Sequence, residues 1–287
     1  MSFITANSFL FNSRNSADFG VVIGWIDTDT DVSTNGLHRE LKKTANTNRT
    51  RIHVYGTENT ETITFHISIV KADGGELTRA ASIQINRWLM SSSLPRLLKF
   101  NDCDAFPLHY YAVCTQINDI MTGGRLIGKE LTFETNAPYA FSEKEEKTYE
   151  ITEENRTFFL NNSADTDNGI YYPTVTILTT SDKVIVENVT DQKSVTICTQ
   201  KLVADTNGIK ALILNSENMT VTDSSGRLIP AGDLGWDKNY KSYVAVTKCD
   251  MNTIYWIRLL HGMNEFWVSE NCTIKIKYEF PKKAGCF

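Results

Sequence analysis

The chain has 287 residues, of which 41% are hydrophobic and 22% are charged, so its composition is that of a folded globular protein and excludes a wholly disordered one. Its 29 lysines and arginines against 34 aspartates and glutamates give a net charge of −5. That balance argues against specific nucleic-acid recognition, because nucleic-acid-binding domains are usually basic. No apolar run approaches the roughly 20 residues of a membrane-spanning helix, so we expect no membrane insertion.

The N-terminal segment MSFITANSFLF lacks the basic residues and the long apolar stretch of a secretory signal. The chain contains six cysteines that are scattered and form no CxxC pair: Cys103, Cys114, Cys198, Cys249, Cys272 and Cys286. The sequence therefore predicts synthesis in a reducing cytoplasm, with mostly free thiols. The length predicts one large or two ordinary domains.

The first half of the chain alternates apolar and polar residues, notably at 51–55, 63–69 and 110–114, and this period of two is typical of half-buried strands. One segment instead has the helical period of three and four. It follows Asp73-Gly74-Gly75, should end before Pro95, and places these residues on one face: Leu77, Ala80, Ala81, Gln84, Ile85, Trp88 and Leu89. The pattern predicts one amphipathic helix laid on a sheet.

A polar segment before these elements, residues 33–51, is rich in basic side chains. We interpret it as a solvated arm or hairpin, with a docking surface for an acidic partner protein as the alternative; nucleic-acid binding is the least favoured interpretation. The basic residues of this arm are Arg39, Lys42, Lys43, Arg49 and Arg51.

A glycine-rich stretch at residues 123–129, GGRLIGK, has the GxxxxGK spacing of a phosphate-binding loop. Such a loop requires Ser or Thr after the lysine and a helix that follows. Here Glu130 comes next, and the pattern after it is that of a strand. We therefore predict a hairpin turn at this place and no nucleotide site.

The stretch SEKEEKTYEITEE, residues 142–154, is dense in charge and poor in large apolar residues, which is typical of a linker or a solvated face. It predicts a boundary between a first domain, residues 1–141, and a second, residues 142–287. Strand patterns at 174–178, 184–186 and 273–278, separated by Asn-Gly and Ser-Gly turns, indicate a second β-sandwich or barrel. The fold class is mainly β, with one α-helix in the first domain.

Templates for catalysis and metal binding fail throughout the chain. There is no HExxH pair and no GxSxG elbow. An EF-hand loop needs Gly at its sixth and Glu at its twelfth position, where the stretch from Asp27 has Val32 and His38, and the stretch from Asp165 places Gly169 at a ligand position. A looser surface calcium site stays open as an alternative to the default of a solvated loop. The sequence therefore predicts no catalytic residues, no metal site and no cofactor.

Several segments, taken in order, resemble the distal tail proteins (Dit) of long-tailed bacteriophages and related tail-like particles. Near the start, FLFN (9–12) is followed by SADFGV (16–21), which is similar to a family opening in which a strand leads into a D-[FY]-G segment. LTFE (131–134) with APYA (137–140) resembles the closing strand of the family's first domain. YPTVTI (172–177), IVEN (185–188), LLHGMNEF (259–266) and KIKY (275–278) with PKKAG (281–285) are similar to its second domain. The polar segment 33–51 departs from the family pattern.

The resemblance implies a β-sandwich with a helix and a β-hairpin arm, followed by a galectin-like jelly-roll β-sandwich. In this family the first domains form a hexameric ring at the distal end of the tail tube, and the second domain projects outward. The ring lies between the tail tube protein, the tape-measure protein and the hub or tail-associated protein, and it can anchor receptor-binding proteins. The resemblance thus implies a virion structural protein of the tail tip or baseplate, assembled in the bacterial host cytoplasm, which is not an enzyme.

The alternative hypothesis is a carbohydrate-binding protein that contributes to adsorption to the host cell surface, because galectin-like sandwiches often bind sugars through aromatic side chains. Trp236, between Gly235 and Asp237, is the candidate for sugar contact. Trp256 and Trp267 lie in apolar strand patterns, so we expect them in the core.

Overall fold

The computed structural model describes residues 6–24, 40–44, 53–58, 62–101, 107–166, 168–199, 202–228 and 255–283. The chain divides into two compact units, one formed by Met1–Glu143 with Pro281–Phe287 and the other by Lys144–Phe280. The sequence places its boundary two residues earlier and assigns the end of the chain to the second domain. The end of the chain instead returns to the first unit, because strand β20 (Pro281–Lys282) pairs antiparallel with β10 (Ala140–Phe141).

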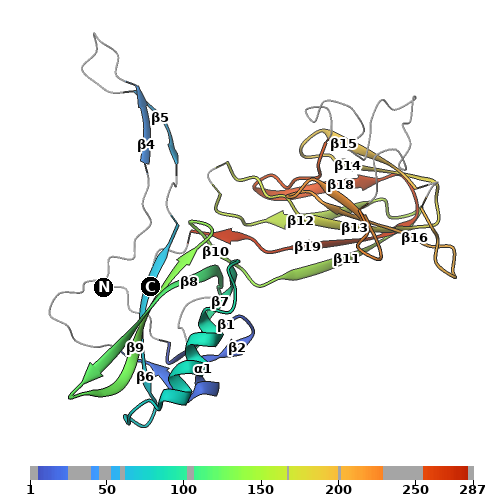
Figure 1. The fold of residues 1–287 in the computed structure, drawn as a ribbon. Coiled ribbons are helices and arrows are strands. Elements are labelled where there is room, and N and C mark those ends of the chain that lie inside the picture. Colours follow the sequence, from blue (N-terminus) through green and yellow to red (C-terminus); the bar gives the residue numbers. More distant parts are fainter. Residues whose placement is uncertain are drawn as a thin grey trace. The chain divides into compact units, whose positions relative to one another are not determined.

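The first unit is built on a seven-stranded antiparallel sheet in the order β2-β1-β7-β8-β9-β6-β3 (Figure 1). Its strands are β1 (Ser8–Phe11), β2 (Arg14–Asn15), β3 (Val21–Ile23), β6 (Thr64–Lys71), β7 (Arg96–Asn101), β8 (Tyr110–Thr122) and β9 (Arg125–Thr135). A short 3-10 helix, η1 (Ser16–Phe19), connects β2 to β3 and is capped by Asn15. A separate two-stranded sheet consists of β4 (Glu40–Thr44) and β5 (His53–Glu58).

The predicted helix is confirmed as α1 (Arg79–Leu89). Thr78 caps its first turn by accepting a hydrogen bond from the Ala81 amide, as a threonine just before a helix often does. The apolar face is buried against the sheet: Trp88 stacks on Phe9 with ring centroids 5.6 Å apart. The Trp88 indole N–H donates to the Phe11 carbonyl at 2.9 Å, which satisfies its only polar atom in the core.

The predicted hairpin turn at the GxxxxGK stretch is also confirmed, since β8 and β9 pair on either side of Gly123 and Gly124. Both glycines have positive φ angles, 58° and 79°, which a two-residue hairpin turn of this kind requires. Glycine is required at position 128 because of a close backbone approach: a Cβ there would lie 2.4 Å from the carbonyl oxygen of Ile69 on β6. Lys129 is fully buried and pairs with Asp119 on the facing strand, so each part of the motif has a structural role.

The second unit is a β-sandwich of two antiparallel sheets, as the sequence predicts. The five-stranded sheet has the order β11-β19-β13-β16-β17, and the four-stranded sheet has the order β12-β18-β14-β15. The strands are β11 (Glu145–Ile151), β12 (Thr157–Asn162), β13 (Thr174–Thr179), β14 (Lys183–Asn188), β15 (Lys193–Cys198), β16 (Lys210–Asn215), β17 (Thr220–Asp223), β18 (Gly262–Val268) and β19 (Cys272–Tyr278).

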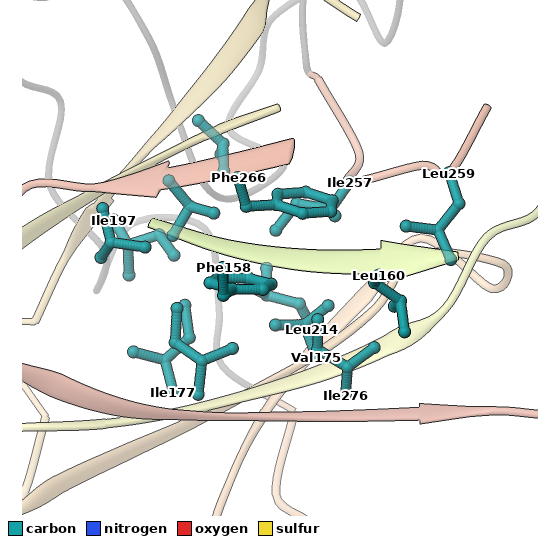
Figure 2. Close-up of a cluster of buried hydrophobic side chains, with 14 of the residues drawn as sticks. Phe158, Leu160, Val175, Ile177, Ile197, Leu214, Ile257, Leu259, Phe266 and Ile276 are labelled. Carbon is teal, nitrogen blue, oxygen red and sulfur yellow. The ribbon is translucent and has the colours of Figure 1, made fainter. Parts of the chain in front are cut away.

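Buried side chains from both sheets fill the space between them (Figure 2). Phe158 of β12 stacks on Phe266 of β18 at 4.9 Å between ring centroids, and Ile177 and Ile276 face them from the other sheet. The alternating burial along these strands has the period of two that the sequence shows. Fold class is therefore predictable from the pattern alone.

Candidate interaction surfaces

No group of three His, Cys, Asp or Glu residues in the described part of the chain could hold a metal ion. Within the same residues, no helix is long and apolar enough to cross a membrane. The features that stand out are surfaces, and four of them are described below.

The first surface includes the described part of the basic arm, residues 40–44, which form β4 and pair antiparallel with β5. Lys42 and Lys43 are exposed on it, beside Leu41 with 53% and Val54 with 48% of their surface exposed. Arg39, Arg49 and Arg51, the other basic residues of the predicted docking arm, lie outside the described residues. An isolated two-stranded hairpin is marginally stable, so exposed apolar side chains on one favour contact with another surface.

The second surface is an open strand edge on β8. Strand β7 pairs with β8 only at Tyr110, Tyr111 and Ala112, so residues 113–122 have no hydrogen-bonded strand on that side among the described residues. On the far side of the sheet, β3 pairs with β6 only at residues 69–71, which leaves 64–67 without a strand partner there among the described residues. Unpaired N–H and C=O groups along a strand edge can pair with another chain.

The third surface is a hollow between α1 and the β1–β2 turn, named here the arginine hollow. Phe19 and Trp88 are stacked there, with ring centroids 4.5 Å apart. Around this stack lie polar and basic side chains: Asn12, Arg14, Gln84, Arg87 and Ser91.

The fourth surface is the outer face of the four-stranded sheet in the second unit. Trp267, expected in the core, is 37% exposed on this face, because Phe266 beside it occupies the inward position. Phe159 is 55% and Met263 is 59% exposed on the same face. The strand register places Phe159 opposite Glu265, and diagonal to both Trp267 and Met263.

Two carboxylates accompany these aromatic side chains. Glu187 of β14 is directly opposite Trp267, and Glu265 lies between Met263 and Trp267 along β18. The outer face therefore presents two aromatic side chains beside two acids. Trp256, in contrast, is 9% exposed and belongs to the core as expected. Trp236, the predicted sugar contact, lies outside the described residues.

A buried polar network holds the turn in the LLHGMNEF segment, residues 259–266. The Asn264 side chain accepts a hydrogen bond from the Leu260 amide at 2.8 Å and donates to the Leu260 carbonyl at 2.7 Å. Asn188 donates to Asn264 and to the carbonyl of Arg258. The Arg258 guanidinium in turn binds Asp191 through two hydrogen bonds of 2.7 and 2.9 Å. These residues position a turn, and their role is structural.

Arg258 changes the pKa of its partner, Asp191. Its hydrogen bonds lower the pKa of the Asp191 carboxyl below the usual range, against the opposing effect of burial. Burial, as the largest cause, raises the pKa of the Cys114 and Cys272 thiols to about 11. Both cysteines are free and buried, and a raised pKa keeps a thiol protonated and unreactive at neutral pH.

Comparison with known proteins gives two findings that agree. Residues 4–137 match a family model described as a phage tail protein N-terminal domain. In fold, the chain is similar to the Dit protein of phage SPP1, with a TM-score of 0.60 and 10% identity over 95% of this chain and 98% of that one. That structure is described as a paradigm of the hub adsorption apparatus in phages that infect Gram-positive bacteria.

A chain in the phage P2 baseplate, in its activated conformation with Ca, aligns with a TM-score of 0.49 and 9% identity over 94% of this chain and 97% of that one. A comparison with curated proteins found no match. The match to the phage tail family model therefore lies within the first unit. The whole chain has the distal tail fold, which confirms the resemblance to distal tail proteins that the sequence indicates.

Proposed function

We propose that this protein is a non-enzymatic component of the tail tip or baseplate of a bacteriophage or phage-tail-like particle, where six copies form a ring. The observation that carries the proposal is the open edge of β8 in a unit that matches a phage tail domain. A soluble domain normally covers or disrupts such an edge. Ten consecutive residues, 113–122, without a strand partner among the described residues are best explained by pairing with another chain.

Ring closure requires two different complementary patches on each copy. The open edges of β8 and β6 lie at opposite sides of the three strands β8-β9-β6. The β8 edge of one copy can therefore pair with the β6 edge of the next copy. Repeating such a contact around an axis joins the sheets into a closed wall without free edges. The number of copies, six, comes from the resemblance to distal tail proteins.

In this role the ring joins the tail tube and tape-measure proteins to the hub or tail-associated protein, and it anchors receptor-binding proteins. The basic arm fits a docking role toward an acidic surface of one of these partners, because Lys42 and Lys43 lie beside exposed Leu41 and Val54. The assembled protein is then located at the tail tip of the virion.

The ring is tested with the purified full chain by light scattering after size exclusion and by negative-stain imaging. Met121 is 56% exposed at the open edge, and Met121→Lys should weaken assembly at least tenfold, because an edge lysine must be desolvated in the contact. Met219→Lys is the matched control, since Met219 is 46% exposed on a turn of the second unit. Monomers at all concentrations, or equal assembly of both variants, would count against the proposal.

A second candidate function, carbohydrate binding in host adsorption, is favoured by the outer face of the second unit. Exposed aromatic rings stack on the apolar faces of sugars, and neighbouring carboxylates accept hydrogen bonds from hydroxyl groups. Trp267 and Phe159 supply the rings, and Glu187 and Glu265 the acids. This function is compatible with the ring, because it uses the other unit.

An array of bacterial glycans tests the second candidate. Trp267→Ala should abolish any glycan signal, whereas Tyr172→Ala, which removes an exposed aromatic ring outside the strands of this face, should retain it. The absence of any signal from the wild-type protein, or equal loss in both variants, would exclude this face as a sugar site.

A further inference from the structure

The arginine hollow in the first unit has the composition of a protein-docking pocket. Energetic centres of protein interfaces are enriched in Trp, Tyr and Arg and are shaped as pockets. Here the aromatic stack of Phe19 and Trp88 adjoins two arginines, Arg14 from β2 and Arg87 from the last turn of α1. We propose that the arginine hollow binds an acidic, amphipathic segment of a partner protein, with a carboxylate between the two guanidinium groups.

Within the described ranges, no acidic side chain pairs with the two arginines of the hollow. Arg14 and Arg87 are both exposed, and the guanidinium group of neither forms an ion pair or hydrogen bond with any residue that the structure describes. Other cations of the first unit do have acidic partners, for example Lys71 with Asp73 and Lys99 with Glu143. A guanidinium binds a carboxylate through two parallel hydrogen bonds, so two free guanidiniums beside one hollow favour a ligand with carboxylates.

The polar groups of the hollow are held in place. Asn12 Nδ2 donates to Ser91 Oγ at 3.0 Å, and the Ser91 hydroxyl donates to the Trp88 carbonyl at 2.7 Å. Asn12 has a φ of 47°, so its backbone is in the left-handed region at the turn that leads to Arg14. The turn is therefore fixed to the end of α1, and the wall of the hollow is formed before a partner binds.

Exposed apolar side chains continue the surface along the helix. Ile83, Arg87 and Met90 are spaced by four and three residues, so they follow one stripe of the α1 surface. Ile83 is 44% exposed, Met90 is 49% and Leu94, just after the helix, is 65%. A partner segment that fits must thus combine acidic with apolar side chains, which excludes a purely electrostatic ligand such as a phosphate backbone.

This inference rests on the proposed tail role, because that role provides the partner protein that would occupy the hollow. It concerns the helix side of the first unit, whereas ring formation is assigned to the edges of the sheet. Assembly and peptide binding can therefore be measured separately in the same preparations.

The test uses the full chain and three fluorescein-labelled peptides of twelve residues in fluorescence anisotropy. One peptide carries Glu and Leu in an amphipathic pattern, the second has Gln in place of Glu, and the third has Lys. A single-stranded oligonucleotide serves as competitor. The variants are Arg14→Ala, Arg87→Ala and the double variant. Arg79→Ala is the matched control, because Arg79 is exposed on the same helix but does not line the hollow.

The acidic peptide should bind at least tenfold more tightly than the other two. Arg14→Ala and Arg87→Ala should each lower the affinity for the acidic peptide about three- to fivefold, as expected for partly exposed charge pairs, and the double variant should lower it about tenfold or more. Arg79→Ala should change this affinity by less than about twofold. Equal binding of the three peptides, no binding of the acidic one, full competition by the oligonucleotide, or equal effects of Arg79→Ala and Arg87→Ala would overturn the proposal. Rings that form normally in every variant leave the tail role intact whichever way the peptides behave.

Discussion

Replacing Asn264 with leucine should destabilise the second unit strongly, although leucine is similar in volume. Asn264 is fully buried on β18, and its side chain forms four hydrogen bonds. Three of them hold the turn at residues 260–262, and the fourth joins Asn188. Leucine can replace none of these bonds, so buried donors and acceptors lose their partners.

The magnitude follows from the number of bonds. Each hydrogen bond contributes about 0.5–1.5 kcal/mol net, and a buried group without a partner costs about 1–3 kcal/mol. Leu260 is partly exposed, so water can replace some of the lost bonds there. We therefore expect a loss of about 3–4 kcal/mol in the free energy of unfolding of the second unit. With a urea dependence of about 2 kcal/mol per molar, its midpoint falls by roughly 1.5–2 M.

The assay is urea unfolding of the full chain, followed by circular dichroism and tryptophan fluorescence and fitted with one transition for each unit. Asn161→Leu is the matched control, because Asn161 is exposed on the neighbouring strand β12. It should change the free energy of unfolding by less than about 0.5 kcal/mol. A loss below about 1 kcal/mol for Asn264→Leu, or equal losses in both variants, would refute the argument that this network holds the turn.

Three further predictions concern packing and titration. Gly128→Ala should lower the free energy of unfolding of the first unit by about 2–4 kcal/mol, because the new Cβ would lie 2.4 Å from the Ile69 carbonyl oxygen. The same urea assay measures this loss, and an unchanged midpoint would contradict the close approach. The lowered pKa of Asp191 stabilises the fold above its unfolded pKa of about 3.9, and this contribution is lost as pH falls through the lower folded value, so Asp191→Asn should flatten the stability profile below about pH 4; an unchanged slope would argue against the pairing. Cys114 and Cys272, with pKa values of about 11, should resist maleimide at pH 8 in the native chain and react after unfolding, as mapped by mass spectrometry; rapid native labelling at either would show that it is not buried.

Local patterns in the sequence were sufficient for the elements whose stability is local. The helix over residues 79–89 follows from its apolar spacing and from the glycines and proline that flank it. The hairpin at Gly123 and Gly124 follows from turn chemistry and from the strand pattern after Lys129. In both cases neighbouring residues decide the structure, so no distant contact is needed to infer it.

The outer face of the second unit shows what was missed and why. The apolar surroundings of Trp267 predict a core position, but a strand sends adjacent side chains to opposite faces. Phe158 with Phe159, and Phe266 with Trp267, are adjacent pairs, and one member of each pair must face outward. Adjacent aromatic residues within a strand were therefore a usable signal. Which member is exposed depends on pairing with strands far away in the sequence.

The arginine hollow and the open edge of β8 had no comparable signal. Arg14 and Arg87 are 73 positions apart in the numbering, and only the packing of α1 on the sheet brings them to one hollow. The edge exists because β7 is short relative to β8, a property of two strands together. Such features arise from tertiary structure, which periodicity cannot reveal.

The pairing of β10 with β20 has a consequence for how this protein can change. Phe141 is paired with Pro281, so the chain leaves the first unit and re-enters it at neighbouring backbone positions. The second unit is therefore an insertion with adjacent ends, held by two covalent connections. A domain whose insertion point has two adjacent ends tolerates exchange of the inserted domain, because any fold with neighbouring termini can be joined to these two ends. Evolution or design could thus replace the whole inserted unit between residues 141 and 281 while retaining the sheet, the helix and the edges of the first unit.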